Sequence, residues 1–255
     1  KKVITAWNGL MITSFAEASA ILQRKDYLRA SENCASFILK NLYRDGRILR
    51  TFKDGESRLV GYLEDYSCLA DALISLHEAT LNLKWLEKAN LVTDKMIDLF
   101  WDKESSIFYD TGRDHEQLIL RPRDIFDNAM PCGGSMAVNV LLRMGLITGK
   151  SNYTNIAIET LSHIASWITS HPQGFGEWLI ALDFHLDTHK EIAIIGDINN
   201  SATVSLLNAI YSNFLPNKIL VGKQDEDNSC LVQSPLLTGR GLLNNRPTAY
   251  VCQDY

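Results

Sequence analysis

Gly61-Tyr62-Leu63-Glu64-Asp65-Tyr66 is the stretch that decides the fold, because it sets aromatic and acidic residues where an amphipathic helix begins. Apolar residues then recur at helical spacing, at Tyr66, Leu69, Leu73 and Leu76. Three further blocks of similar character occur at helix starts: Trp7-Asn8-Gly9, Asp127-Asn128-Ala129-Met130-Pro131-Cys132-Gly133-Gly134 and Gly174-Phe175-Gly176-Glu177-Trp178. The sequence therefore predicts a repeated helix whose unusual residues lie at its N-terminal end.

A second helix, which lacks such a mixture of aromatic and polar residues at its start, is expected after each of the first three blocks. These partner helices begin alike, at Tyr27-Leu28-Arg29-Ala30, Trp85-Leu86-Glu87-Lys88-Ala89 and Tyr153-Thr154-Asn155-Ile156-Ala157. Self-similarity at a spacing of roughly 50 to 60 residues indicates a helical repeat array. We expect a ring of helical hairpins whose inner helices build a pocket at one mouth.

Strand signals fill the segments between hairpins. Residues 47–52 and 57–60 flank Lys53-Asp54-Gly55-Glu56, and its Asp-Gly pair favours a β-hairpin. Residues 107–110 and 117–121 predict a second ribbon. Each crossover enters the N-terminus of an inner helix, so both ribbons should rim the mouth and bring arginines close to it: Arg50, Arg58, Arg121 and Arg123.

The pattern changes at about residue 190. Residues 191–196 and 218–222 are expected strands, residues 201–214 an expected helix, and residues 248–252 a possible extension of the unit. We therefore expect a mainly α protein with two parts. Residues 1–189 form a partial (α/α)6 toroid, and residues 190–255 form a small α/β appendage packed on it.

Composition excludes several classes of protein. The 255 residues are 46% hydrophobic and can bury a substantial core. A formal charge of −5 provides no basic field for nucleic acid or for an anionic membrane, and no apolar run reaches the roughly 18 residues of a membrane span. The cysteines include no Cys-x-x-Cys pair, which favours a reducing, cytoplasmic setting; they are Cys34, Cys68, Cys132, Cys230 and Cys252.

Four ordered motifs together resemble a known family. They are Ala6-Trp7-Asn8-Gly9-Leu10-Met11, the block at residues 61–66, Asp127-Asn128-Ala129-Met130-Pro131 and Thr248-Ala249-Tyr250-Val251-Cys252. They resemble the C-terminal region of the spermatogenesis-associated, thioredoxin-domain-containing proteins, whose bacterial members are called YyaL. The resemblance implies a toroid similar to six-hairpin glycosidases and N-acylglucosamine 2-epimerases, preceded by a thioredoxin-like domain. That toroid has twelve helices and about seven are counted here, so we expect the chain to work with a thioredoxin-like domain and with further toroid helices.

Four carboxylates are candidates for catalysis: Glu64, Asp65, Asp127 and Glu177. Glycoside hydrolysis needs a carboxyl pair about 5 to 5.5 Å apart for retention or about 6.5 to 9.5 Å apart for inversion. The simpler alternative is that acidic residues in a first turn stabilise the helix dipole, which is worth about 0.3 to 1 kcal/mol. If Asp65 serves the pocket, the sequence predicts that Asp65→Asn keeps most of the fold; a large drop in melting temperature would instead assign the carboxylate to stability.

Substrate-binding candidates surround these carboxylates. The rings of Trp7, Tyr62 and Trp178 could stack on a sugar or belong to the core, while Asn8 and Asn128 could bind hydroxyls or cap helices.

Two further candidates have particular chemistry. Arg121 and Arg123 could clamp a carboxylate or phosphate, which would suit a uronate, or could be solvated charges. Cys132 follows Pro131 at a helix start and could be a reactive thiol, although no histidine adjoins it. The family tends toward Pro-Ser-Gly-Asn-Ser here, and Gly134 replaces its amide.

No metal or cofactor is expected, since His185 and His189 fall at a predicted helix end and G-x-G-x-x-G is absent. Epimerases of this kind commonly use a histidine base, and none of the four blocks contains one. The sequence thus favours a domain that binds or processes a sugar or uronate-like small molecule. The alternative is a non-catalytic accessory domain of a thioredoxin-like redox protein.

Overall fold

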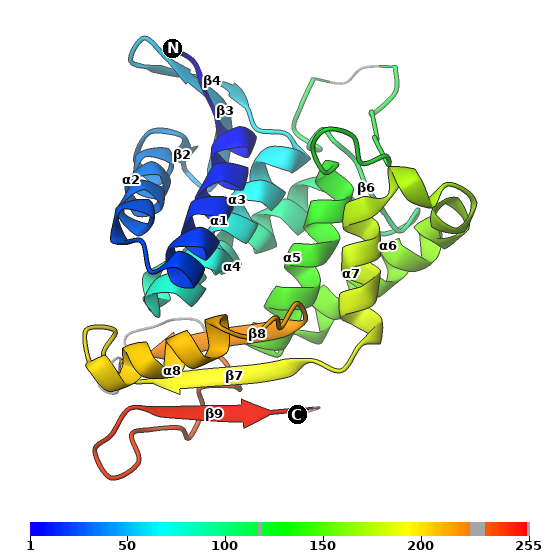
Figure 1. Cartoon of the computed structure of the whole chain (residues 1–255). Coiled ribbons are helices and arrows are strands. Elements are labelled where there is room, and N and C mark those ends of the chain that lie inside the picture. The colour runs from blue at the N-terminus through cyan, green and yellow to red at the C-terminus, as the bar shows by residue number, and fades with distance from the viewer. Residues whose placement is uncertain (117–118, 225–232, 254–255) are drawn as a thin grey trace.

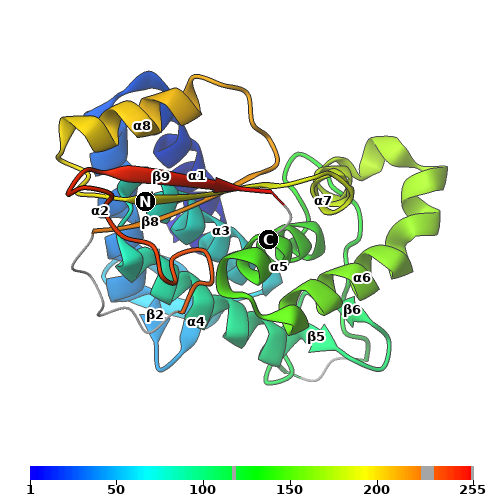
Figure 2. The same cartoon turned by 90° about the horizontal axis from the view of Figure 1, so that it is seen from below.

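Helices dominate the computed structural model, which describes residues 1–116, 119–224 and 233–253. Four helices form an inner row: α1 (Thr5–Leu22), α3 (Leu63–Thr80), α5 (Gly133–Thr148) and α7 (Gly176–Leu186). Three others lie outside them: α2 (Lys25–Asn41), α4 (Leu83–Phe100) and α6 (Ser151–Ser170). Within the row, α1 packs on α3, α3 on α5 and α5 on α7, as the two views of the chain show (Figures 1 and 2). This is the expected partial toroid of helical hairpins.

Helix α3 lies at the centre of the packing. It contacts α1, α4 and α5, and most of its residues are buried on every side. A helix that is apolar or small all round is stable only when neighbours cover it. The alternation of Leu69, Leu73 and Leu76 with Ala70 and Ala72 allows those neighbours to approach closely.

The N-terminal ends of the inner helices carry the first expected ribbon. Strand β3 (Arg47–Lys53) pairs antiparallel with β4 (Glu56–Val60), and β1 (Val3–Ile4) and β2 (Tyr43–Arg44) join β3. Asp54 and Gly55 both have positive φ, as the predicted Asp-Gly turn requires. The ribbon therefore fixes Arg50, on β3, beside the start of α3.

The second ribbon differs from the prediction. Strand β6 (Ile107–Phe108) pairs with the preceding β5 (Trp101–Asp102), and residues 119–121 are not in a strand. The turn at residues 103–106 joins β5 directly to β6, so β6 pairs with the segment before it and not with the segment after it. Gln117 and Leu118 of the predicted partner lie outside the described residues.

The C-terminal unit contains the expected elements. Strand β7 (Lys190–Ile195) pairs in parallel with β8 (Lys218–Lys223) across α8 (Ser201–Tyr211), and in antiparallel with β9 (Thr248–Cys252). The sheet lies across the C-terminal ends of the inner helices (Figure 1). There the Gly222 N–H donates to His77 Nε2 over 3.2 Å. Because Ala193 and Val221 belong to the same core as the helices, a division at residue 190 stays a proposal.

None of the helices in the described ranges is both long and apolar enough to cross a membrane.

Candidate functional site

A cavity of about 650 Å³ opens where α3 and α5 begin. We call it the mouth cavity. Its walls come from β3, from the start of α3 and from the loop before α5; they are formed by Arg50, Tyr62, Glu64, Asp110, Asp124, Phe126, Asn128, Ala129, Met130, Pro131, Cys132 and Gly133. The sequence predicted the position of this cavity and four of its residues: Tyr62, Glu64, Asn128 and Cys132.

Arg50 organises one wall of the mouth cavity. Its Nη1 lies 2.6 Å from Glu64 Oε1, and its guanidinium lies 4.7 Å from the centre of the Tyr62 ring. The Glu64 side chain keeps 27% of its surface exposed. A carboxylate, a guanidinium and an aromatic face therefore meet at the surface of one hollow.

Asp65, the neighbour of Glu64, is fully buried behind this wall. One oxygen accepts the Ala6 N–H at 3.0 Å, and the other accepts the Tyr62 N–H and faces Arg50 Nη1, each at 3.0 Å. Burial raises the pKa of Asp65 to about 6, although Arg50 and the two N–H groups oppose that rise. Asp65 joins the starts of α1 and α3 to β3 and thereby positions Arg50, without reaching the cavity itself.

Two acidic residues of the lining, Asp110 and Asp124, were not identified from the sequence. Asp110 Oδ2 accepts the Asp124 N–H at 2.8 Å. Burial, together with the charges of Asp124 and Glu64, raises the pKa of Asp110 to about 6, although the Asp124 N–H and Arg123 oppose that rise. Both residues lie outside the helices and strands. Hydrophobic periodicity therefore does not show in which direction their side chains point. The charged run Arg121-Pro122-Arg123-Asp124 is the local sequence feature that could have drawn attention to Asp124.

Asp127 lies in the loop that precedes α5. One oxygen accepts the Cys132 N–H at 2.9 Å and the Ser135 hydroxyl at 2.7 Å, while the other accepts the Glu177 N–H at 2.9 Å. Asp127 therefore ties together the starts of two inner helices, which is the capping alternative considered for such residues.

Trp178 is buried, and its indole N–H donates to the Ile125 carbonyl over 3.0 Å. A Cβ on residue 134 would come within 3.2 Å of the Trp178 ring. Gly134 thus allows the Trp178 ring to approach this closely.

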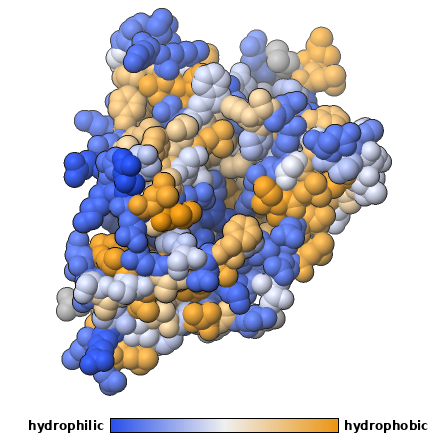
Figure 3. All heavy atoms as spheres, in the orientation of Figure 1, coloured by the Kyte–Doolittle hydropathy of each residue, from blue (hydrophilic) through white to orange (hydrophobic). Residues whose placement is uncertain are grey.

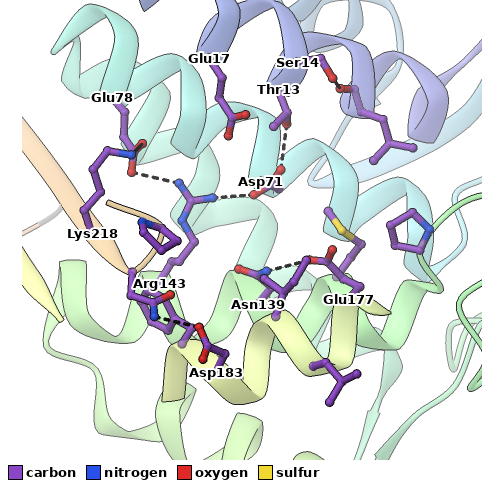
Figure 4. A pocket seen from close by; sticks show the side chains of 18 residues that line it. Thr13, Ser14, Glu17, Asp71, Glu78, Asn139, Arg143, Glu177, Asp183 and Lys218 are labelled. Carbon is purple, nitrogen blue, oxygen red and sulfur yellow. Dashed lines mark hydrogen bonds and ion pairs between the residues drawn. The ribbon is translucent and has the colours of Figure 1, made fainter. Parts of the chain in front are cut away.

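A second cavity, of about 700 Å³, runs along the concave face of the inner helices. We call it the central cavity. Arg143 of α5 extends between Asp71 and Glu78 of α3, with N–O distances of 2.6 and 3.0 Å (Figure 4). Thr13 donates to Asp71 over 2.8 Å, and Glu17 overhangs the same space from α1.

Glu177 faces the central cavity and not the mouth cavity. Its Oε1 accepts a hydrogen bond from Asn139 Nδ2 over 2.7 Å (Figure 4). Burial raises the pKa of Glu177, and Asp71 raises it further. Pro131 lines both cavities, so the two hollows adjoin at the start of α5.

Three further residues that the sequence proposed for ligand binding line neither cavity. Trp7 is 55% exposed on α1, and Asn8 donates to the Ile4 carbonyl and accepts from the Cys34 thiol. Arg121 packs 4.2 Å over the Tyr109 ring and donates to the Thr111 carbonyl.

Cys132 lines the mouth cavity but is largely buried at the start of α5. Burial raises the pKa of its thiol to about 11, which leaves it protonated at neutral pH. Cys34, Cys68 and Cys252 are also free thiols, and Cys230 lies outside the described residues. Within the described ranges, no group of three or more metal-ligating side chains comes together.

The sequence is related to known proteins along nearly its whole length. Human spermatogenesis-associated protein 20 is 30% identical over 265 residues, which cover 99% of this chain and 34% of that protein. The rat protein of the same name is 30% identical over 268 residues, with the same two coverages. The chain therefore spans about a third of the length of these curated relatives. No protein-family model matches it.

Solved structures share the helical architecture. Cellobiose 2-epimerase from Spirochaeta thermophila superposes with a TM-score of 0.53 at 17% identity, covering 64% of this chain and 43% of that chain. A GH76 α-mannanase from Bacteroides thetaiotaomicron gives 0.52 at 16% identity, covering 65% and 45%. An inactive α-1,6-mannanase variant from Salegentibacter, in complex with α-1,6-mannotriose, gives 0.52 at 17% identity, covering 64% and 47%. At these identities the likeness establishes the fold.

Proposed function

Since the chain is homologous to spermatogenesis-associated protein 20 and its helices form an α/α toroid of the glycosidase-like kind, we propose that it binds a sugar in the mouth cavity. The observation that carries this proposal is that Glu64, Arg50, Tyr62 and Asp110 all line one cavity, with Glu64 and Tyr62 both in contact with Arg50. Carboxylates and a guanidinium can bind sugar hydroxyls, and an aromatic face can stack on the ring.

We propose further that Glu64 and Asp110 form a carboxyl pair for glycoside hydrolysis. Glu64 forms an ion pair with Arg50, while burial raises the pKa of Asp110 to about 6. Two carboxyls in environments that differ in this way are suited to the roles of base or nucleophile and of acid. Asp65 and Asp127 enter the proposal as positioning residues, and Glu177 as a carboxylate of the adjoining central cavity.

The charge of the mouth cavity favours a neutral sugar over a uronate. Its lining holds the carboxyl groups of Glu64, Asp110 and Asp124 against the single guanidinium of Arg50. When all are ionised, two negative charges remain in excess and repel a carboxylate ligand. The uronate hypothesis rested on Arg121 and Arg123, and neither lines the mouth cavity: Arg121 contacts Tyr109 and Thr111, and Arg123 lies 3.4 Å from His163.

Turnover should depend on the ionisation of Asp110. If protonated Asp110 gives its proton to the leaving oxygen, activity on α-1,6-mannobiose or cellobiose should fall as pH rises through about 6. Above that pH the loss should approach roughly tenfold per pH unit, because the protonated fraction falls by that factor. Reducing-end release between pH 4.5 and 8 measures this, and Asp110→Asn should lower turnover and abolish the decline above about pH 6. A flat profile, or unchanged turnover in Asp110→Asn, would remove Asp110 from the chemistry.

The alternative function, a non-catalytic accessory domain, is favoured by one specific observation. Large apolar side chains are exposed at both ends of the inner row, with Trp7 and Met11 on α1 and with Ile180 and Leu186 on α7. Figure 3 shows apolar patches over these two helices with hydrophilic surface between them. Exposed apolar surface of this kind is typical of an interaction face. Further toroid helices or a thioredoxin-like domain are the partners we propose for it.

The isolated chain should therefore self-associate in a concentration-dependent way, because water-exposed apolar area favours contact between copies. Sedimentation velocity over a hundredfold concentration range measures this. Met11→Lys combined with Ile180→Lys should shift the distribution toward monomer. A single monomeric species of the unmodified chain at every concentration would contradict the expectation.

A further inference from the structure

Three rings follow one face of α6 near its C-terminal end. His163 and Trp167 are four residues apart on α6, so their side chains lie on the same face of the helix, and His171 is the residue that caps its C-terminal end. Trp167 is 45% exposed, and its ring centre lies 6.4 Å from that of His171, with 33° between the ring planes. An indole that exposes nearly half its surface beside a second ring of similar orientation offers a broad flat face.

Phe126 connects this face to the mouth cavity. Its ring centre lies 6.5 Å from that of Trp167 with 82° between the ring planes, an edge-to-face contact, and the side chain is 40% exposed. Phe126 also lines the mouth cavity. We define the aromatic ledge as Phe126, Trp167 and His171; it begins at the wall of the mouth cavity and continues along α6.

The ledge is anchored to the core. The Phe126 ring lies 5.1 Å from that of Phe175, which is fully buried. The Asp127 N–H donates to the Gly174 carbonyl over 2.8 Å, and a Cβ on residue 174 would come within 3.0 Å of the Phe126 ring. Gly174 therefore allows Phe126 to pack at this depth, so that the ring is held by the structure around it.

Polar groups accompany the rings. Arg123 Nη1 lies 3.4 Å from His163 Nε2, and Asp124 precedes Phe126 in the wall of the mouth cavity. Aromatic faces flanked by hydrogen-bonding side chains suit a molecule with apolar C–H faces and a polar edge, as a pyranose ring has.

We propose that the aromatic ledge binds the second and third rings of an oligosaccharide whose first ring occupies the mouth cavity. This inference rests on the proposed sugar-binding function, and it identifies the ligand as an oligosaccharide and not a free monosaccharide. Because Phe126 lines the mouth cavity and also contacts Trp167, one oligosaccharide could extend from the cavity onto the ledge.

The test compares two probes, α-1,6-mannotriose and cellotriose, each with its own monosaccharide, by calorimetric titration of the 255-residue chain. Both trisaccharide and monosaccharide should bind, and at least one trisaccharide should bind about tenfold or more tightly than its monosaccharide. Trp167→Ala should remove that gain while changing monosaccharide affinity less than about twofold, and Trp167→Phe should retain most of it, because the phenyl ring preserves a stacking face.

Phe214→Ala is the matched control, because Phe214 is 92% exposed and lies after α8, outside both cavities and the ledge. Its trisaccharide affinity should equal that of the unmodified chain, and the melting temperatures of all variants should agree within a few degrees. If Trp167→Ala binds each trisaccharide as tightly as the unmodified chain does, the aromatic ledge is not a binding site, while the mouth cavity can still bind the sugar. Absence of binding of every probe to the unmodified chain would overturn the proposed function and the ledge with it.

Discussion

Replacing Asp65 by asparagine is expected to lower the free energy of unfolding by about 2 to 4 kcal/mol. Asp65 is fully buried, and its two oxygens accept from two backbone N–H groups and from Arg50. Asparagine offers one acceptor oxygen, so its amide N–H₂ would face a donor. The substitution also removes one of the two carboxylates that neutralise Arg50.

Urea denaturation of the two proteins at pH 7 measures this loss. Glu56→Gln is the control, because Glu56 is exposed and pairs only with Arg58 on the same ribbon, and it should change stability by less than about 0.5 kcal/mol. A loss below about 1 kcal/mol in Asp65→Asn would show that its burial and contacts contribute little. From the sequence, an Asp65 that serves the pocket was expected to tolerate asparagine, because only its place in the first turn of a helix was known. Its complete burial is the reason why a larger loss of stability is now expected.

The second large effect concerns Glu64. Glu64→Gln is expected to lower any glycoside turnover by about 10²- to 10⁴-fold, the range typical of removing a catalytic acid or base. Stability should change little, because Arg50 keeps its ion pair with Asp65 and the Glu64 side chain is partly exposed. Turnover of α-1,6-mannobiose and cellobiose, together with melting temperature, measures the two properties separately. Undiminished turnover in Glu64→Gln would exclude this carboxylate from the chemistry.

Adjacent carboxylates illustrate what sequence patterns can resolve. Glu64 and Asp65 are about 100° apart around a helix, so they face different surroundings. Asp65 lies one turn before Leu69, within the buried stripe, and this spacing alone points it inward. The repeat itself was predictable because every hairpin carries local signals of period and helix start.

Other parts of the site depend on contacts between distant segments. Asp110 and Asp124 lie in irregular chain, where no periodicity assigns a direction to a side chain. Trp178 was a candidate for stacking on a ligand, yet its ring is buried in the core, where it packs against Gly134. The second ribbon was mispredicted because β6 pairs with β5, a segment for which the sequence analysis predicted no strand.

The central claim is that a neutral sugar binds in the mouth cavity through Glu64. Calorimetric titration of α-1,6-mannotriose and cellotriose into the unmodified chain, Glu64→Gln and Glu56→Gln tests it most directly. We expect saturable binding to the unmodified chain and to Glu56→Gln with equal affinity. Binding to Glu64→Gln should be at least about tenfold weaker, which is roughly 1.4 kcal/mol for a lost charge-assisted hydrogen bond. Equal affinity in all three proteins, or no binding to any of them, would contradict the claim and favour the accessory-domain alternative.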